Sequence, residues 1–226
     1  MRNTPRLAWV ILLISFSICL VLVVSGPLAA RWFVAHSATD EPAVLRVTSG
    51  TMLLLASQLG DPIAVVDTRN VESGTLIQSD QSSQGRLSFT LNGAANSPEV
   101  ATVQIYPTAQ VALARNNQPR FGLSRDPRRI TIEVRNGRVR INTAEVMPTG
   151  LEFTVVTPQS MIDLGPGSFA VQVSNDETLV VSRFGEATVE GEGKGVVLTE
   201  GVGTTVRTGQ PPGEPAVTAD NLIVNG

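Results

Sequence analysis

The sequence is poor in the side chains on which most catalytic and metal-binding sites depend. It has one Cys, one His, one Tyr, two Trp and seven Phe among 226 residues. A single Cys cannot form an internal disulfide or a Cys-rich zinc site. A single His excludes His-paired metal sites and argues against Ser-His-Asp or Cys-His catalysis. We therefore expect no enzymatic activity, no metal and no cofactor.

Charged residues are absent from one long segment, residues 7–30, which reads LAWVILLISFSICLVLVVSGPLAA. As a helix these residues would extend about 36 Å, enough to cross a hydrocarbon core of roughly 30 Å. Arg2 and Arg6 precede the segment, and the positive-inside rule then places the N-terminus in the cytoplasm. We expect a single-pass signal anchor in the cell membrane, with the rest of the chain outside the cytoplasm, periplasmic or extracellular.

A cleaved signal peptide is the alternative interpretation of this segment. Signal peptides have apolar regions of about 7–15 residues followed by small residues at the cleavage site. The run here is longer, which favours an uncleaved anchor, although Gly26, Ala29 and Ala30 supply small residues near its end. Both interpretations place the rest of the chain outside the cytoplasm.

The remainder of the chain has the pattern of an all-β protein. Short runs rich in Val, Ile, Thr and Phe alternate with Gly, Asn, Asp and Pro, and no helical periodicity is present. We expect a sandwich or roll of short antiparallel hairpins, preceded by the transmembrane helix. The expected organisation is a cytoplasmic tail (1–6), the helix (7–30), a linker (31–42), the β domain (43–209) and a Pro/Gly-rich C-terminal tail (210–226).

One hairpin has a specific turn signal. Asn136-Gly137 is a preferred pair for a two-residue type I′ turn, in which both residues need positive φ. Such a turn predicts Val134 opposite Val139 and Ile132 opposite Ile141, all facing the core. We also expect the strands to be interrupted at 165–167 and near 185, where further glycines occur.

Arginine dominates the basic residues, and its distribution suggests a binding surface. Between Arg115 and Arg140 there are eight Arg against two acids, whereas from Ile141 onward eleven acids face three bases. We predict a patch for an anionic partner, such as a polysaccharide, a phospholipid headgroup or an acidic protein face. Its members are Arg120, Arg125, Arg128, Arg129, Arg135, Arg138 and Arg140. Alternatively, these arginines pair with the acidic C-terminal half of the same domain. Nucleic acid is not an expected partner, because the exported part is net acidic.

The order of several turn patterns resembles that of FecR-type domains. The chain has an I-x-V-x-x-G-x-V step at 132–139 and a strand leading into V-x-T-P at 153–158. A G-x-x-x-F-x-V step falls at 165–171, and V-x-x-x-G-x-x-x-V follows at 181–189. The resemblance covers about 43–209. It implies an extracytoplasmic all-β module behind one membrane anchor, which in the best-known members senses an outer-membrane receptor and controls a sigma factor from the cytoplasm.

The chain departs from this family pattern on the cytoplasmic side. Only residues 1–6 precede the apolar segment, and a folding unit needs tens of residues. We therefore expect a bacterial membrane-anchored binding or sensing module in envelope signal transduction, without its own sigma-factor-binding domain and with a protein or anionic polymer as partner. The alternatives are a structural or polysaccharide-binding surface protein of the cell envelope and, less favoured, an exported hydrolase.

Overall fold

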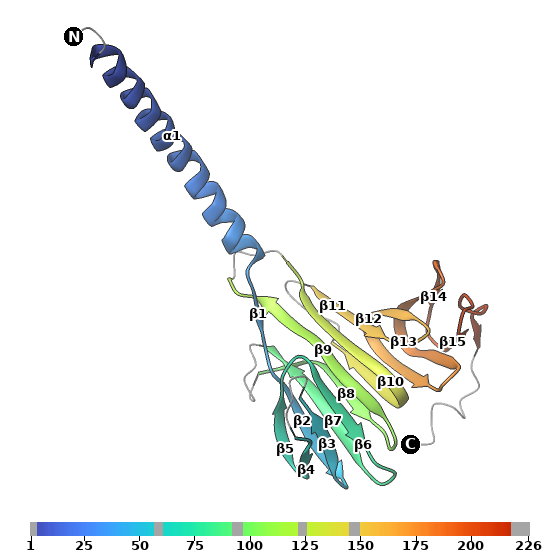
Figure 1. Cartoon of the computed structure of the whole chain (residues 1–226). Coiled ribbons are helices and arrows are strands. Elements are labelled where there is room, and N and C mark those ends of the chain that lie inside the picture. The colour runs from blue at the N-terminus through green and yellow to red at the C-terminus, as the bar shows by residue number, and fades with distance from the viewer. Residues whose placement is uncertain (1–3, 57–60, 92–96, 122–125, 145–149, 218–226) are drawn as a thin grey trace. The chain divides into compact units, whose positions relative to one another are not determined.

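The computed structural model describes residues 4–56, 61–91, 97–121, 126–144 and 150–217. The chain divides into two units. One comprises residues 1–38 together with 119–126, and the other comprises 39–118 together with 127–226. The first contains a long helix and the second is built from strands (Figure 1).

Helix α1 (Thr4–His36) contains the apolar segment. Its most apolar part, Leu12–Val34, is 23 residues long, which at 1.5 Å per residue is about 35 Å and enough to cross a membrane. Large apolar side chains of this helix, including Trp9, Trp32 and Phe33, are more than half exposed. The expectation of one N-terminal helix able to span a membrane is confirmed, and its orientation stays a prediction.

Outside helix α1 the described chain consists of strands and the turns that join them, which confirms the all-β fold class. The strands are β1 (Ala38–Asp40), β2 (Ala43–Ser49), β3 (Met52–Leu55), β4 (Ile63–Val65), β5 (Thr68–Val71), β6 (Thr75–Ser79), β7 (Gln84–Thr90), β8 (Glu99–Ile105), β9 (Gln110–Pro119), β10 (Arg128–Thr143), β11 (Leu151–Val156), β12 (Met161–Val173), β13 (Glu177–Gly191), β14 (Lys194–Leu198), β15 (Val202–Arg207) and β16 (Ala216–Val217).

Hydrogen bonds join these strands into one continuous sheet that forms two layers. The first layer runs β5-β2-β7-β8-β10-β12-β13-β15-β16. The second layer runs β4-β3-β6-β9-β10-β11-β12-β13-β14. The long strands β10, β12 and β13 belong to both layers, each with a different half. In Figure 1, β10 lies between β8 and β9 on one side and β11 and β12 on the other.

The core lies between the two layers. Residues alternate along each strand, so that Leu45, Leu87 and Val103 of the first layer are fully buried while their neighbours in the chain face outward. Phe89 of the first layer meets Phe153 of the second with perpendicular rings whose centres are 5.9 Å apart. This is a favoured aromatic geometry, and each ring contributes roughly 1.5–3 kcal/mol by its burial.

Strand β10 differs from the sequence prediction. The expected hairpin at Asn136-Gly137 is wrong, because residues 128–143 form one strand of 16 residues. Before Gly137 this strand pairs with β9 and β11, and after it with β8 and β12. Val134 and Val139 are both buried, but they do not face each other across a turn. Gly137 has the positive φ of +88° that the turn signal implies, yet the chain continues forward.

The pairing requires β10 to bend sharply. Ile130 pairs with Phe153, Phe153 with Leu164, and Thr143 with Gly167. The path from Ile130 to Thr143 crosses between neighbouring strands three times, about 5 Å each time, and follows β12 for three residues from Leu164 to Gly167. It places Ile130 within about 25 Å of Thr143, whereas a straight strand would separate them by about 43 Å. The strand therefore turns from one layer into the other, and its end returns toward its own beginning.

This bend explains a pairing that the sequence did not predict. β10 and β11 are parallel, with Arg128 opposite Leu151 and Glu133 opposite Val156. Parallel neighbours ordinarily need a crossover of a dozen or more residues. Here the chain leaves β10 at Thr143, already close to the start of β10, so the short link to Leu151 is sufficient. The hydroxyl of Thr143 confirms the closeness of the layers, since it donates to the carbonyl oxygen of Gly165 at 2.7 Å.

Other glycines mark a second corner, at the opposite end of the layers: Gly137 stands opposite Val173, whereas Gly167 stands opposite Thr143, the last residue of β10. The predicted interruptions at 165–167 and near 185 fall inside the continuous strands β12 and β13. Gly185 has φ +88° and pairs with Gly167, where the backbones of the two bent strands come together. A Cβ on Gly185 would lie 2.1 Å from the carbonyl oxygen of Pro166. Glycine signals in this sequence thus indicate bends within strands as well as chain reversals.

The corner at Gly137 can be tested by substitution. A Cβ there would lie 2.5 Å from the Cα of Ala109, a buried residue between β8 and β9. We expect Gly137→Ala to lower the free energy of unfolding by about 1–2 kcal/mol from the positive φ and by a further 1–3 kcal/mol from the clash. Chemical denaturation of the full chain in neutral detergent, followed by the β-sheet circular dichroism signal, measures this loss.

Gly193→Ala is the matched control. Gly193 has a similar positive φ of +72°, but nothing lies within 4 Å of its Cβ position. This variant should lose only the contribution of the positive φ. Equal losses for the two variants would show that close packing at Gly137 does not stabilise the bend.

Candidate functional site

Arg128, the first residue of β10, is buried rather than exposed. Only 2% of its surface is accessible, so its predicted place in an exposed arginine patch is wrong. Its guanidinium donates to the carbonyl oxygen of Thr90 at 2.6 Å and to Oδ1 of Asn116 at 2.8 Å. It also lies 3.3 Å from the carboxylate of Glu41, which is itself 8% exposed.

These residues form one buried polar cluster, made of Glu41, Thr90, Asn116, Gln118 and Arg128. Asn116 contacts Glu41 twice, since its side-chain amide donates to the Glu41 carbonyl oxygen at 2.8 Å and its own carbonyl accepts from the Glu41 backbone N–H at 2.9 Å. The side-chain amide of Gln118 donates to the Glu41 carboxylate. The cluster thus joins both layers and holds the segment between β1 and β2.

Electrostatics explain why the cluster has this composition. Burial lowers the pKa of Arg128, and the negative charge of Glu41 opposes that shift. An arginine keeps its proton in proteins, so the charge is neutralised by a partner rather than by deprotonation. Glu41 supplies that partner, and the carbonyl of Thr90 and the amide of Asn116 satisfy further N–H groups.

The arginines that follow on β10 point to opposite faces of the β domain. Arg129 and Arg135 lie on the outer face of the second layer, whereas Arg138 and Arg140 lie after the bend, on the outer face of the first layer. A bend that carries a strand from one layer into the other also reverses the outward direction. The arginines expected in a single patch are therefore divided between two surfaces.

On the second layer the arginines are neutralised by nearby acids. Arg129 binds Glu152 at 2.7 Å, and Arg135 binds Glu133 at 3.0 Å. The hydrogen bond with Glu133 raises the pKa of Arg135. The pairing of Arg129 with Glu152 agrees with the alternative hypothesis, in which the arginines pair with the acidic C-terminal half.

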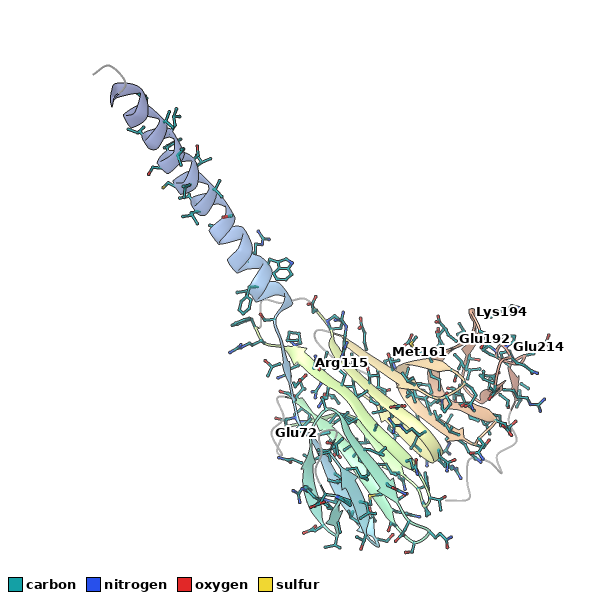
Figure 2. The ribbon with its side chains drawn as sticks, in the orientation of Figure 1. Glu72, Arg115, Met161, Glu192, Lys194 and Glu214 are labelled. Atoms are coloured by element: carbon teal, nitrogen blue, oxygen red, sulfur yellow. The ribbon has the colours of Figure 1, made fainter. Side chains whose placement is uncertain are left out.

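A shallow groove crosses this outer face. Its lining residues are Ala114, Arg115, Arg129, Thr131, Glu152, Thr154, Val156 and Met161. Arg115 and Met161, labelled in Figure 2, come from strands β9 and β12. Basic, acidic, apolar and hydroxyl side chains mix in the groove, so it has no uniform charge.

On the first layer, arginines from distant parts of the sequence come together. Arg46 of β2 pairs with Arg86 of β7, Arg86 pairs with Gln104 of β8, and Gln104 pairs with Arg140 of β10. Residues directly opposite each other share a face of the sheet. We call Arg46, Arg86 and Arg140, with Gln104 between the last two, the arginine row. The row forms only when strands that are distant in sequence pair with each other. The sequence prediction therefore did not include Arg46 and Arg86.

Arg138 lies beside this row, two residues from Arg140 on the same strand. Its guanidinium lies over the ring of Tyr106, 5.0 Å from the ring centre. Tyr106 is only 6% exposed, so the ring supports the guanidinium from below and restricts its movement. The first layer thus presents four arginines on one face.

Two members of the predicted patch lie elsewhere. Arg120 belongs to the unit that contains helix α1, where its backbone N–H donates to the carbonyl oxygen of Ser37 at 2.9 Å and its guanidinium lies 5.8 Å from the ring centre of Phe121. Arg125 lies outside the described residues. In the part of the chain that the structure describes, no group of three or more His, Cys, Asp or Glu side chains is placed to hold a metal ion.

The buried cluster predicts very different effects for two adjacent arginines. Arg128→Met leaves the Glu41 carboxylate buried without its cation and should lower the free energy of unfolding by about 3–5 kcal/mol. Arg129→Met is the matched control, because the Arg129–Glu152 pair is about half exposed on both sides and contributes less than about 1 kcal/mol. Denaturation of both variants in neutral detergent measures the difference.

A double variant tests the reason for the loss. Adding Glu41→Gln to Arg128→Met removes the isolated negative charge, so part of the stability should return. A loss within 1 kcal/mol of the control for Arg128→Met, or no recovery in the double variant, would contradict a stabilising buried ion pair.

Comparisons with known proteins identify no family. No family model matches the sequence, and no curated protein matches it. Two crystal structures of a "putative anti-sigma factor" from Parabacteroides distasonis ATCC 8503 are similar, each with a TM-score of 0.46, and they are 18% and 17% identical in sequence. Each match covers 66% of this chain and 62% of the other, so less than two thirds of those proteins is represented.

Proposed function

We propose that this chain is a membrane-anchored binding module whose β domain works outside the cytoplasm in signal transduction across the cell envelope. The observation that carries the proposal is the combination of helix α1, long and apolar enough to cross a membrane, with a β domain that exposes four arginines on one face. The order of the FecR-type turn patterns in residues 132–189 supports it. Binding, rather than catalysis, is the proposed activity.

The buried cluster suits such an anchored module. Glu41 follows the last helical residue, His36, by five positions and is held inside the β domain by Arg128, Asn116 and Gln118. A force transmitted along the chain from the anchor would therefore act first on strand β1, which pairs with β9, and then on a buried ion pair, rather than on a free linker. This attachment favours a module that stays folded while it is fixed to a membrane.

Topology can be tested by labelling engineered cysteines. In a Cys19→Ser background, Lys194→Cys places a thiol at the exposed first residue of β14 in the β domain, which is labelled in Figure 2. We expect a membrane-impermeant maleimide to label this variant in intact spheroplasts. Asn3→Cys, on the other side of the apolar segment, should react only after the membrane is permeabilised.

The same samples distinguish the anchor from a signal peptide. A retained anchor leaves the full-length mass in the membrane fraction after a carbonate wash, whereas cleavage releases a shorter protein. Labelling of Asn3→Cys in intact spheroplasts together with protection of Lys194→Cys would refute an extracytoplasmic β domain.

The second candidate function is a polysaccharide-binding surface protein of the cell envelope, which the arginine row favours. The two functions differ in what the anchored protein binds in its own membrane. Cross-linking and purification of the full chain should recover an envelope receptor or regulatory protein if it signals. Recovery of acidic polymer alone would favour the surface-protein function.

A further inference from the structure

We propose that the arginine row is a binding site for a linear acidic polysaccharide, laid across strands β2, β7, β8 and β10. This inference rests on the proposed function as a binding module outside the cytoplasm and names the chemical class of its ligand. It concerns a surface that differs from the patch the sequence predicts. Two of its three arginines, Arg46 and Arg86, come from outside the arginine-rich segment.

The spacing of the row fits charges repeated along a chain. Neighbouring strands lie about 5 Å apart, so Arg46 and Arg86 are one strand apart and Arg86 and Arg140 are two strands, or about 10 Å, apart. The row runs across the strands in a line. Gln104, between the last two arginines, adds an amide that can donate to a hydroxyl or carboxylate oxygen.

The side chains of the row are accessible while their backbone is fixed. Arg46 and Arg86 are exposed, with 53% of the Arg86 side chain accessible. Arg140 and Gln104 are half-buried. Leu45, Leu87, Val103, Val139 and Ile141, their inward-facing neighbours, are fully buried. A carboxylate can thus accept two hydrogen bonds from one guanidinium. Little flexibility is lost on binding, because the sheet already holds the backbone of these side chains in place.

The charge balance of the face also favours an anion. Like charges directly opposite each other on a sheet are destabilising, and Arg46 stands opposite Arg86. Among the described residues, the acid that pairs with the row is Glu99, whose carboxylate lies 3.5 Å from Arg86 and is about half exposed. A bound anion would relieve the repulsion between Arg46 and Arg86. The second layer has no such excess at Arg129 and Arg135, because Glu152 and Glu133 neutralise them.

Binding to polygalacturonate, with neutral dextran as reference, tests the inference. The full chain in neutral detergent should bind polygalacturonate and not dextran, and the affinity should fall as salt is raised, because exposed charges are screened. Arg46→Gln, Arg86→Gln and Arg140→Gln combined should weaken binding by at least about 10-fold, since charge-assisted hydrogen bonds are lost at three positions.

The control removes three positive charges from the other face. The variant with Arg115→Gln, Arg129→Gln and Arg135→Gln has the same change in net charge but keeps the arginine row. It should bind polygalacturonate as the wild type does. Equal weakening in both triple variants would show that net charge, rather than the row, governs binding and would overturn the proposal.

Two other results would also overturn it. One is the absence of polygalacturonate binding by the wild type at low salt. The other is equal affinity for polyglutamate, which would assign the row to an acidic protein face instead. The cysteine labelling separates these failures from a failure of the proposed function. A β domain labelled from outside, without polysaccharide binding, refutes the arginine row site and leaves the anchored module standing.

Discussion

The architecture of the β domain depends on the bend of one strand, β10, at Gly137. The strand passes from the second layer into the first at this residue, and each half pairs with strands of its own layer. The bend brings the end of β10 back toward its beginning, which allows the next strand, β11, to pair in parallel after a short link. It also reverses the outward direction along the strand, so that arginines close in sequence serve two separate surfaces. A side chain at Gly137 would collide with Ala109, and the geometry of the corner therefore requires glycine.

The buried ion pair between Glu41 and Arg128 has a complementary role at the other end of β10. Hydrophobic packing alone closes the centre of the sandwich, where Phe89 meets Phe153. Near the start of β10 a charged side chain instead crosses from the second layer to Thr90 of the first. A buried pair of this kind adds little net stability compared with a hydrophobic pair, but losing one partner is costly. Its geometry therefore fixes which segment lies at this position, and that segment is the one that follows helix α1.

The sequence predicts well what depends on local chemistry and poorly what depends on strand pairing. The apolar helix and the all-β class follow from hydrophobic runs and alternation, and both are confirmed. Positive φ at Gly137 and Gly185 agrees with their glycine signals. Whether such a glycine reverses the chain or bends it depends on partners far away in sequence, such as Ala109 for Gly137. For the same reason Arg128 could not be distinguished from Arg129 as a buried residue. Alternation separates their faces, but the acid that neutralises Arg128 is Glu41, more than eighty residues earlier.

Tyr106, which lies beneath Arg138, and the two tryptophans lie in different units of the chain, so their spectroscopic signals report on different units. Both tryptophans, Trp9 and Trp32, lie in helix α1, whereas the one tyrosine of the sequence lies beneath a guanidinium beside the arginine row. Tryptophan emission therefore reports the surroundings of the helix, and the near-ultraviolet absorption and circular dichroism of tyrosine report the face of the β domain. A ligand that draws Arg138 away from the ring would alter the tyrosine signal while the tryptophan signal stays constant. The native chain can thus report separately on helix α1 and on its arginine face without an added label.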